Sequence, residues 1–386
     1  MMTFVVIKYL SISVCFFSVF CACTSSKAIY IHNPSPWNRT GCVAEVDLSL
    51  TGGMMKEGLV VEDESGKRVP CQITHDHQLL FSVDVPAIST VKYKLRQART
   101  EQYDTVCLAQ IRHDFQDDLT WENDRGGYRL YGPAYKNGGG NVGGYDIWTK
   151  SVAFPVLAQR YFDHCQRGIS YHKDHGNGMD AYTVGPTLGA GMNVLMMEGI
   201  PVYPCAYESC EILDNGPLRT SIKINCYPMA VGSDTVRETR IITLDKGSWL
   251  NKTQIRYDGL GTKMRMANGI VVHKQNPRGY VVRGGDKCYM AYADLTDNAN
   301  NGNGVIYIGV VNTVVQDSAG FQTLDPPVGD AIGQVMSHTV YTPGDIFTYY
   351  WGAGWSKGGV RGMLAWEKYL SDFCSNLDYP LEITVK

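Results

Sequence analysis

The segment from Tyr171 to Asp180 reads Tyr-His-Lys-Asp-His-Gly-Asn-Gly-Met-Asp and concentrates imidazole, ammonium and carboxylate groups. Its two glycines predict a tight loop that directs several titratable side chains into one cleft. An imidazole exchanges protons near neutral pH, and a neighbouring carboxylate fixes its tautomer and raises its basicity. We therefore predict proton transfer by this loop. The candidate catalytic residues are Tyr171, His172, Lys173 and His175.

Two other interpretations of this loop stay open. His172, His175 and Asp180 have side chains that can ligate a divalent metal, although His-x-x-His on a loop is a weak metal signature without a third ligand at a recognisable spacing. The two histidines can also lie on the surface without a chemical role. We favour proton transfer over a divalent metal, and a metal over a plain surface position. The pattern itself requires no cofactor.

A second polar segment, from Trp121 to Arg125, reads Trp-Glu-Asn-Asp-Arg. A guanidinium such as that of Arg125 holds a carboxylate or sulfate with two hydrogen bonds, and the flat face of Trp121 suits a sugar ring. This combination predicts an acidic sugar, whereas the structural alternative is a buried Arg–Asp pair that pins a strand. The candidate substrate-binding residues are Trp121, Glu122, Asn123, Asp124, Arg125, Tyr131, Lys150, Asp180 and Arg219. For Lys150 and Arg219 a structural role explains the sequence equally well.

Together the two segments offer the groups that β-elimination from a uronic acid needs. The uronate carboxylate must be neutralised so that the C5 proton becomes acidic, a base must take that proton, and an acid must protonate the departing oxygen. The assignments are Arg125 or Lys150 for the carboxylate, His172 or His175 for the base, and Tyr171 or Tyr131 for the acid. The leading hypothesis is therefore a lyase or dehydratase acting on acidic oligosaccharides.

Two further functions compete with elimination. A glycoside hydrolase would use a carboxylate pair such as Glu122 and Asp174. A non-catalytic glycan-binding lipoprotein would use aromatic platforms, and the 24 tyrosines and 7 tryptophans are compatible with it. The histidine loop favours catalysis, because binding alone rarely needs two imidazoles beside a lysine and an aspartate.

The N-terminus has the features of an export signal. Lys8 precedes an apolar run from Tyr9 to Phe20, which is too short for a confident membrane span. Cys23 follows Ala22 at the position where bacterial lipoproteins carry their lipid, and plain cleavage near Ala28 is the alternative. Because residues 24–28 lack an acidic run, we expect a lipid anchor on the periplasm-facing side of the outer membrane.

The composition argues against two other classes of ligand. The net charge is −3 with a sequence pI near 6.3, and no basic stripe is present, so nucleic acid is an unexpected partner. Residues 138–143 satisfy G-x-G-x-x-G. They lack the preceding buried strand and following helix of a dinucleotide site, and a loop that flanks the site is the better interpretation.

Short alternating strands separated by turn residues dominate the rest of the chain. They predict a small N-terminal β-sandwich over residues 29–96, a polar linker near residues 97–104, and a large all-β sandwich over residues 105–386, after a signal segment at residues 1–23. One helix is expected over residues 361–373, because apolar residues recur there at steps of three and four.

The order of several motifs resembles a known family. The motifs are Trp121–Arg125, Tyr131-Gly132-Pro133, Asp146–Lys150, Tyr171–Gly176, Val184-Gly185-Pro186, Asn215–Arg219 and Tyr350–Trp355. They resemble domain-of-unknown-function family 4861, whose members are exported bacterial proteins encoded among polysaccharide-degradation genes. The resemblance runs from Ile29 to the C-terminal motif. It implies a galactose-mutarotase-like supersandwich preceded by a small β-domain, and it carries no activity with it.

Overall fold

The computed structural model describes residues 26–54, 57–138, 143–204, 206–284, 289–297 and 301–386. Cys23 and its predicted lipid lie outside these residues, as do residues 139–142 of the glycine-rich segment. Within the described ranges the chain consists mainly of antiparallel strands, joined by three α-helices and one short 3₁₀ helix. The predicted all-β sandwich is confirmed. No helix in the described ranges is long and apolar enough to cross a membrane.

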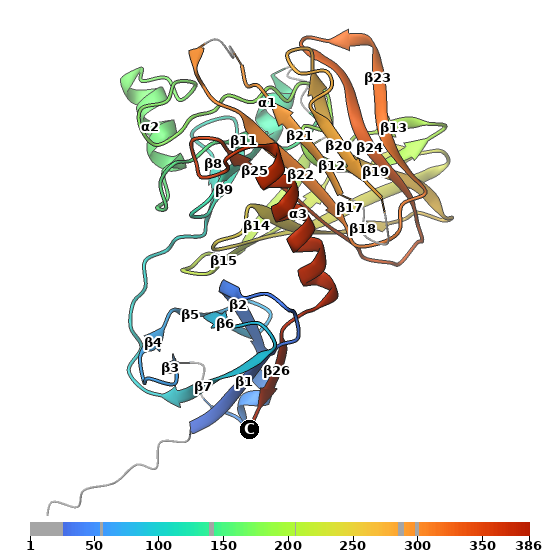
Figure 1. Cartoon of the computed structure of the whole chain (residues 1–386). Helices are drawn as coiled ribbons and strands as arrows, with labels where there is room; N and C mark the ends of the chain where they lie inside the picture. Colours follow the sequence, from blue (N-terminus) through green and yellow to red (C-terminus); the bar gives the residue numbers. More distant parts are fainter. Residues whose placement is uncertain (1–25, 55–56, 139–142, 205, 285–288, 298–300) are drawn as a thin grey trace, which may run out of the picture.

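The N-terminal residues form a small sandwich of two sheets, with strand orders β26-β1-β7-β3-β4 and β2-β6-β5. Alternate residues such as Ile29, Phe81 and Leu95 face inward and are fully buried. The last strand of the chain pairs with β1, so the C-terminus returns to this sandwich (Figure 1). The elements are β1 Ser26–Asn33, β2 Arg39–Asp47, η1 Leu48–Thr51, β3 Leu59–Glu62, β4 Arg68–Val69, β5 Cys71–Ile73, β6 Gln78–Val85, β7 Ser89–Gln97 and β26 Glu382–Val385.

Three further sheets enclose one large apolar core. A four-stranded sheet has the order β11-β10-β9-β8, and a five-stranded sheet has the order β13-β12-β19-β24-β23. A nine-stranded sheet has the order β14-β15-β17-β18-β25-β22-β21-β20, with β16 paired to β17. The first strands are β8 Leu108–Arg112, β9 Asp118–Glu122, β10 Gly127–Leu130, β11 Asp146–Trp148, β12 Ala190–Met197, β13 Ile200–Val202, β14 Tyr207–Asp214 and β15 Arg219–Cys226. The later strands are β16 Met229–Val231, β17 Asp234–Asp245, β18 Leu250–Asp258, β19 Met264–His273, β20 Tyr280–Arg283, β21 Tyr289–Asp294, β22 Ile306–Asn312, β23 Ser318–Val328, β24 Ala331–Tyr341 and β25 Phe347–Trp355.

Aromatic packing joins the four-stranded sheet to the nine-stranded sheet. Trp351 on β25 stacks on Tyr145 with ring centroids 4.0 Å apart, and its ring lies nearly perpendicular to that of Trp121 on β9, with centroids 6.2 Å apart. All three rings are fully buried. The position of the four-stranded sheet, which carries several candidate site residues, is therefore fixed by the core.

The C-terminal helix α3 (Met363–Asp378) confirms the helix that the apolar periodicity predicts. It packs against β21 and β22 of the nine-stranded sheet (Figure 1). Trp366 and Leu370 are fully buried, and the indole N–H of Trp366 donates to the carbonyl of Ile308 at 3.0 Å. Gly309 permits this contact, because a Cβ there would lie 2.7 Å from Leu370.

The sequence did not predict helices α1 (Pro133–Asn137) and α2 (Leu157–Arg167). Helix α2 has no capping side chain of its own at its N-terminus. Instead the Glu122 carboxylate, from β9, accepts the backbone N–H groups of Val156 and Leu157 at 2.9–3.0 Å. The N-terminus of a helix needs such acceptors and favours negative charge. Glu122, which is distant in the sequence, therefore stabilises the first turn of α2.

We predict that Trp366→Ala lowers the free energy of unfolding by about 3–5 kcal/mol, because it removes a fully buried ring. Leu364→Ala on the same helix is the matched control. That side chain is 85% exposed, so its loss should change stability by less than about 0.5 kcal/mol. Urea unfolding of the two variants measures the difference. Equal effects would show that α3 does not stabilise the sheet in this way.

Candidate functional site

Three segments that are distant in the sequence enclose a cleft of about 840 Å³. The lining contains three carboxylates, two lysines and a histidine, all of which can hold charge or transfer a proton. The lining residues are His172, Lys173, Asp174, Asp180, Ala181, Asp297, Asn301, Asn303 and Lys357.

The first wall is the loop that follows helix α2, and its shape comes from Asp174 and two glycines. The Asp174 carboxylate accepts the N–H groups of Gly176 and Gly178 at 2.9 and 3.0 Å. Gly178 has a φ of +105°, and a Cβ there would lie 2.1 Å from the carbonyl oxygen of Thr149. Only glycine fits at this point, so the close contact with Thr149 pins the loop beside β11.

His172 presents an exposed imidazole to the cleft, since its side chain is 57% exposed. Its Nδ1 lies 3.1 Å from the backbone carbonyl of Asp180 and 3.6 Å from the carboxylate of the same residue. A proton on Nδ1 would be donated to the carbonyl. Nε2 would then carry the free lone pair that a general base requires.

Beneath the cleft, the guanidinium of Arg129 holds a cluster of acidic side chains. Arg129 lies opposite Asp146 in the β10–β11 register, and its Nε donates to that carboxylate at 2.7 Å. The Nη2 nitrogen of Arg129 donates two hydrogen bonds, one to the Asp180 carboxylate at 3.0 Å and one to the Tyr131 hydroxyl at 2.7 Å. The carboxylate of Asp118 lies 3.9 Å from Nη1. The three carboxyl groups and Arg129 are all buried.

One positive charge cannot balance three buried carboxylates. Burial raises the pKa of Asp146 and that of Asp180, and the nearby guanidinium of Arg129 offsets only part of this effect. Burial also raises the pKa of Asp118. The cluster therefore favours binding a proton, and Asp180 is the carboxyl group of the cluster that lies beside His172.

The opposite wall is built by hydrogen bonds between loops. The backbone N–H of Asp297 donates to the carbonyl of Ala181 at 3.0 Å, and the Asn303 amide donates to the carbonyl of Asp297 at 2.8 Å. The Trp355 indole donates to the carbonyl of Asn303 at 2.8 Å. Lys357 extends over the Trp355 ring, with its Nζ 5.5 Å from the ring centroid. This wall contributes one carboxylate and one ammonium group.

Of the four candidate catalytic residues, the structure brings His172 and Lys173 into this cleft. His175 lines a separate hollow of about 170 Å³, where its Nε2 lies 3.0 Å from the carbonyl of Ser170. Lys173 borders both spaces. The two imidazoles therefore face different spaces.

Tyr171 is buried beneath the loop instead of facing the cleft. Its ring packs against Trp148 and His164, with centroids 4.7 and 4.0 Å away, and only 6% of the residue is exposed. Burial raises the pKa of its hydroxyl group. Tyr171 is therefore a packing residue here, which corrects its interpretation as a proton donor to substrate.

Trp121, interpreted from the sequence as a sugar platform, is a core residue. Its ring is fully buried and stacks on Tyr128 with ring centroids 5.8 Å apart. Its indole N–H donates to the side-chain oxygen of Asn251 at 2.7 Å. No face of this ring is open to a sugar, so the interpretation is corrected.

Glu122 and Lys150 form a buried ion pair with Nζ 2.7 Å from the carboxylate. Both side chains are almost completely shielded, and burial lowers the pKa of Lys150. Glu122 also caps α2, as described above. Neither side chain can reach a ligand in the cleft. Lys150 therefore does not neutralise a substrate carboxylate, and Glu122 does not belong to a hydrolytic carboxylate pair, which corrects both interpretations.

The remaining residues of this segment hold a turn against the loop before β18. The Asn123 amide donates to the carbonyls of Asp245 and Ser248 at 2.6 and 2.8 Å. Asp124 accepts the N–H of Gly247 at 2.7 Å. The Arg125 guanidinium lies 4.8 Å from the Trp249 ring centroid and remains partly exposed. None of these three side chains lines the cleft.

Tyr131 and Arg219 also lie outside the cleft. Tyr131 borders a different pocket, and its hydroxyl accepts a hydrogen bond from Arg129. Arg219 forms a bidentate pair with Asp245 at 2.6 and 3.0 Å and contacts Glu45 of the small sandwich at 2.8 Å. Arg219 therefore ties the small sandwich to the large one.

The sequence does not identify several residues of this site, among them Arg129, Asp297, Asn303 and Lys357. Arg129 carried a weak signal, since it lies two residues before Tyr131 on the same strand face. The other three lie in loops without a motif. In the part of the chain that the structure describes, no three His, Cys, Asp or Glu side chains are grouped so that they could hold a metal.

The raised carboxyl pKa values predict a specific pH dependence of stability. Because the folded cluster binds protons more tightly than the unfolded chain, its contribution to stability falls as the pH rises from 3.8, the usual aspartate pKa, towards neutrality. The melting temperature should therefore fall as the pH rises over this range, and it should fall less in Asp146→Asn. Asp258→Asn, at a half-exposed carboxylate, should not change this fall. If the melting temperature of both Asp146→Asn and Asp180→Asn depends on pH as in the parent protein, the pKa values of these carboxyl groups are not raised as described.

Comparison with other proteins places the chain in a family. The chain is 24% identical over 363 residues to "Uncharacterized protein P7" of Formosa agariphila, and the match covers 89% of both chains. Two solved Enterococcus faecalis structures are also similar at 10% identity: a glycosyl hydrolase family 38 protein, with a TM-score of 0.45, and an alpha-mannosidase, with a TM-score of 0.49. Each match covers 94% of this chain, which spans less than half of either structure. Residues 31–383 match the family described as "Domain of unknown function (DUF4861)", and the chain belongs to that family.

Proposed function

We propose that this protein is a carbohydrate-active enzyme, a lyase or a dehydratase, that acts on acidic oligosaccharides by β-elimination in the cleft between His172 and Lys357. The observation that carries the proposal is the exposed His172 imidazole, which contacts the buried carboxyl group of Asp180 in a cleft that also holds two lysines. A base, a proton-holding acid and cations for a carboxylate thus line one space.

Each group has a role in the reaction. Lys173 and Lys357 pair with the uronate carboxylate and make the C5 proton acidic. His172 removes that proton, the electron pair forms the C4–C5 double bond, and the C4–O bond breaks. The Asp180 carboxyl group, whose pKa burial raises, protonates the departing oxygen. The exposed His172 imidazole then releases the C5 proton to water from Nε2, and Asp180 takes up a proton from water in the cleft, which restores both groups. These roles replace those of Arg125, Lys150, Tyr131 and Tyr171.

Hydrolysis is a second candidate, because Asp180 and Asp297 both line the cleft. The charge of Asp297 contributes to the raised pKa of Asp180, after burial. A protonated carboxyl group beside an ionised one is the arrangement that glycoside hydrolases use. This pair takes the place of Glu122 and Asp174, of which Glu122 is buried.

A non-catalytic glycan-binding role is less well supported. None of the described residues that line the cleft is a tyrosine, tryptophan or phenylalanine. Sugar binding without catalysis usually relies on such rings. For the location of the protein we retain export and lipid attachment at Cys23, facing the periplasm, as a proposal drawn from the N-terminal sequence.

His172→Ala is expected to reduce the turnover of an acidic oligosaccharide by about 10²–10⁴-fold, because a general base typically contributes that factor. His175→Ala is the matched control. It removes the same side chain from the same loop, but from the separate hollow, so turnover should remain close to that of the parent. Product formation can be followed through the ultraviolet absorbance of the unsaturated uronate. Parent-like turnover in His172→Ala would remove the assigned base.

Lys357→Ala is expected to weaken the binding of an acidic oligosaccharide by about tenfold or more, the usual contribution of a charge-assisted hydrogen bond. Binding of a neutral oligosaccharide of the same length should change little. Calorimetric titration of both ligands measures the two effects. Equal losses would mean that Lys357 maintains the shape of the wall and does not recognise a carboxylate.

A further inference from the structure

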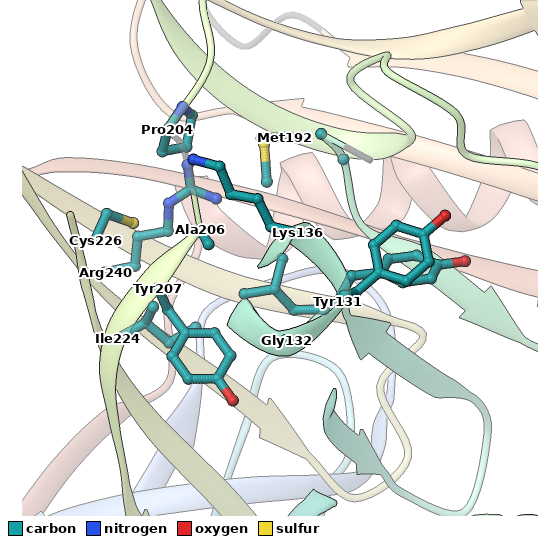
Figure 2. A pocket seen from close by; sticks show the side chains of 14 residues that line it. Tyr131, Gly132, Lys136, Met192, Pro204, Ala206, Tyr207, Ile224, Cys226 and Arg240 are labelled. Atoms are coloured by element: carbon teal, nitrogen blue, oxygen red, sulfur yellow. The ribbon is translucent and has the colours of Figure 1, made fainter. Parts of the chain in front are cut away.

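A second, smaller pocket lies between helix α1 and the nine-stranded sheet, and Figure 2 shows it from close by. Its volume is about 70 Å³, enough for about two water molecules or one carboxylate group. The residues that line it are Leu130, Tyr131, Gly132, Tyr135, Lys136, Gly143, Gly144, Met192, Pro204, Ala206, Tyr207, Ile224, Cys226 and Arg240. None of these lining residues is an aspartate or a glutamate.

Arg240 on β17 supplies a buried guanidinium to this pocket, since only 1% of the residue is exposed. Its Nε donates to Glu238, its Nη1 donates to the Tyr145 hydroxyl at 2.7 Å, and its Nη2 donates to the carbonyl of Asn193 at 3.3 Å. Three of the five N–H groups therefore have acceptors among the described residues. Burial alone would lower the pKa of Arg240, but pairing with Glu238 raises it, so the group stays charged.

Lys136 brings a second positive charge to the same space. Figure 2 shows its side chain reaching from α1 towards Arg240. The ion pair with Glu238 uses the charge of Arg240, whereas Lys136 is an exposed residue, and no residue of the lining is an acid that could pair with it. Two cations thus line a space of this size together with apolar side chains such as Ile224 and Met192, a lining whose charge suits a small anion.

The buried Arg240–Glu238 ion pair is not explained by stability alone. A buried Arg–Glu pair is often no more stabilising than apolar side chains of the same volume. Arg240 also lines a pocket, and two of its five N–H groups have no acceptor among the described residues. A planar carboxylate matches the planar guanidinium and allows two parallel hydrogen bonds.

We propose that this pocket is a second ligand site, which binds a carboxylate between Arg240 and Lys136. The volume admits the carboxylate end of an acidic sugar or a small free carboxylate, but not a whole sugar ring. The site is separate from the cleft. The two are nevertheless close, because Tyr131 of the pocket and Asp180 of the cleft share one nitrogen of Arg129. The proposal does not depend on the chemistry in the cleft.

Calorimetric titration with glucuronate, acetate and glucose tests the proposal. Glucuronate and acetate should bind and glucose should not. Tighter binding of glucuronate than of acetate would identify the end of an acidic sugar as the ligand, and equal binding would identify a small free carboxylate. Lys136→Ala should lower the affinity for glucuronate by about tenfold or more. Ala206→Leu, which fills the pocket, should have a similar effect. Lys368→Ala, an exposed lysine on α3, is the control for loss of one surface charge.

Lys357→Ala separates this site from the cleft. Binding that persists in Lys357→Ala and is lost in Lys136→Ala belongs to the pocket, whether or not the cleft is catalytic. Binding that is lost in Lys357→Ala and unchanged in Lys136→Ala and Ala206→Leu belongs to the cleft and overturns the proposal. Failure of glucuronate and acetate to bind the parent protein would overturn it as well.

Discussion

The ion cluster around Arg129 is the interaction on which the functional part of this protein depends. One guanidinium, on β10, holds Asp146 on the next strand and Asp180 at the end of the histidine loop. It thereby joins the four-stranded sheet to the loop that carries His172. Breaking one partner of such a buried cluster leaves uncompensated charge, so the loop and the sheet are held together by a strong constraint. The glycine contact between Gly178 and Thr149 sets the second point of attachment.

The same cluster links stability to chemistry. A core built only for stability would balance its charges, whereas here three carboxyl groups surround a single guanidinium. The resulting preference for a bound proton costs stability at neutral pH, since ionised carboxylates are poorly solvated there. It also places a carboxyl group of raised pKa, that of Asp180, beside the exposed imidazole of His172. Strain of this kind is typical of sites where groups must exchange protons.

Local sequence predicted the parts of the structure that are encoded locally. Alternation of apolar residues predicted the strands, the stripe containing Trp366 predicted helix α3, and the crowding of titratable groups pointed to the loop that carries His172. Helix α2 was missed because its cap, Glu122, lies 35 residues before Leu157 in the chain. Trp121 was misinterpreted because charged neighbours suggest exposure, whereas only the packing against Trp351 reveals burial. Asp297 and Lys357 reach the cleft through the fold alone, so no spacing in the sequence identifies them.

The mass of the products tests the central claim, elimination in the cleft, most directly. The protein would be incubated with a panel of uronate-containing oligosaccharides and the products weighed by mass spectrometry. Elimination predicts either fragments whose masses sum to that of the substrate, for a lyase, or a product lighter by one water, for a dehydratase. Fragments that together gain one water would assign the cleft to hydrolysis by Asp180 and Asp297. Unchanged masses across the whole panel would contradict catalysis on this class of substrate.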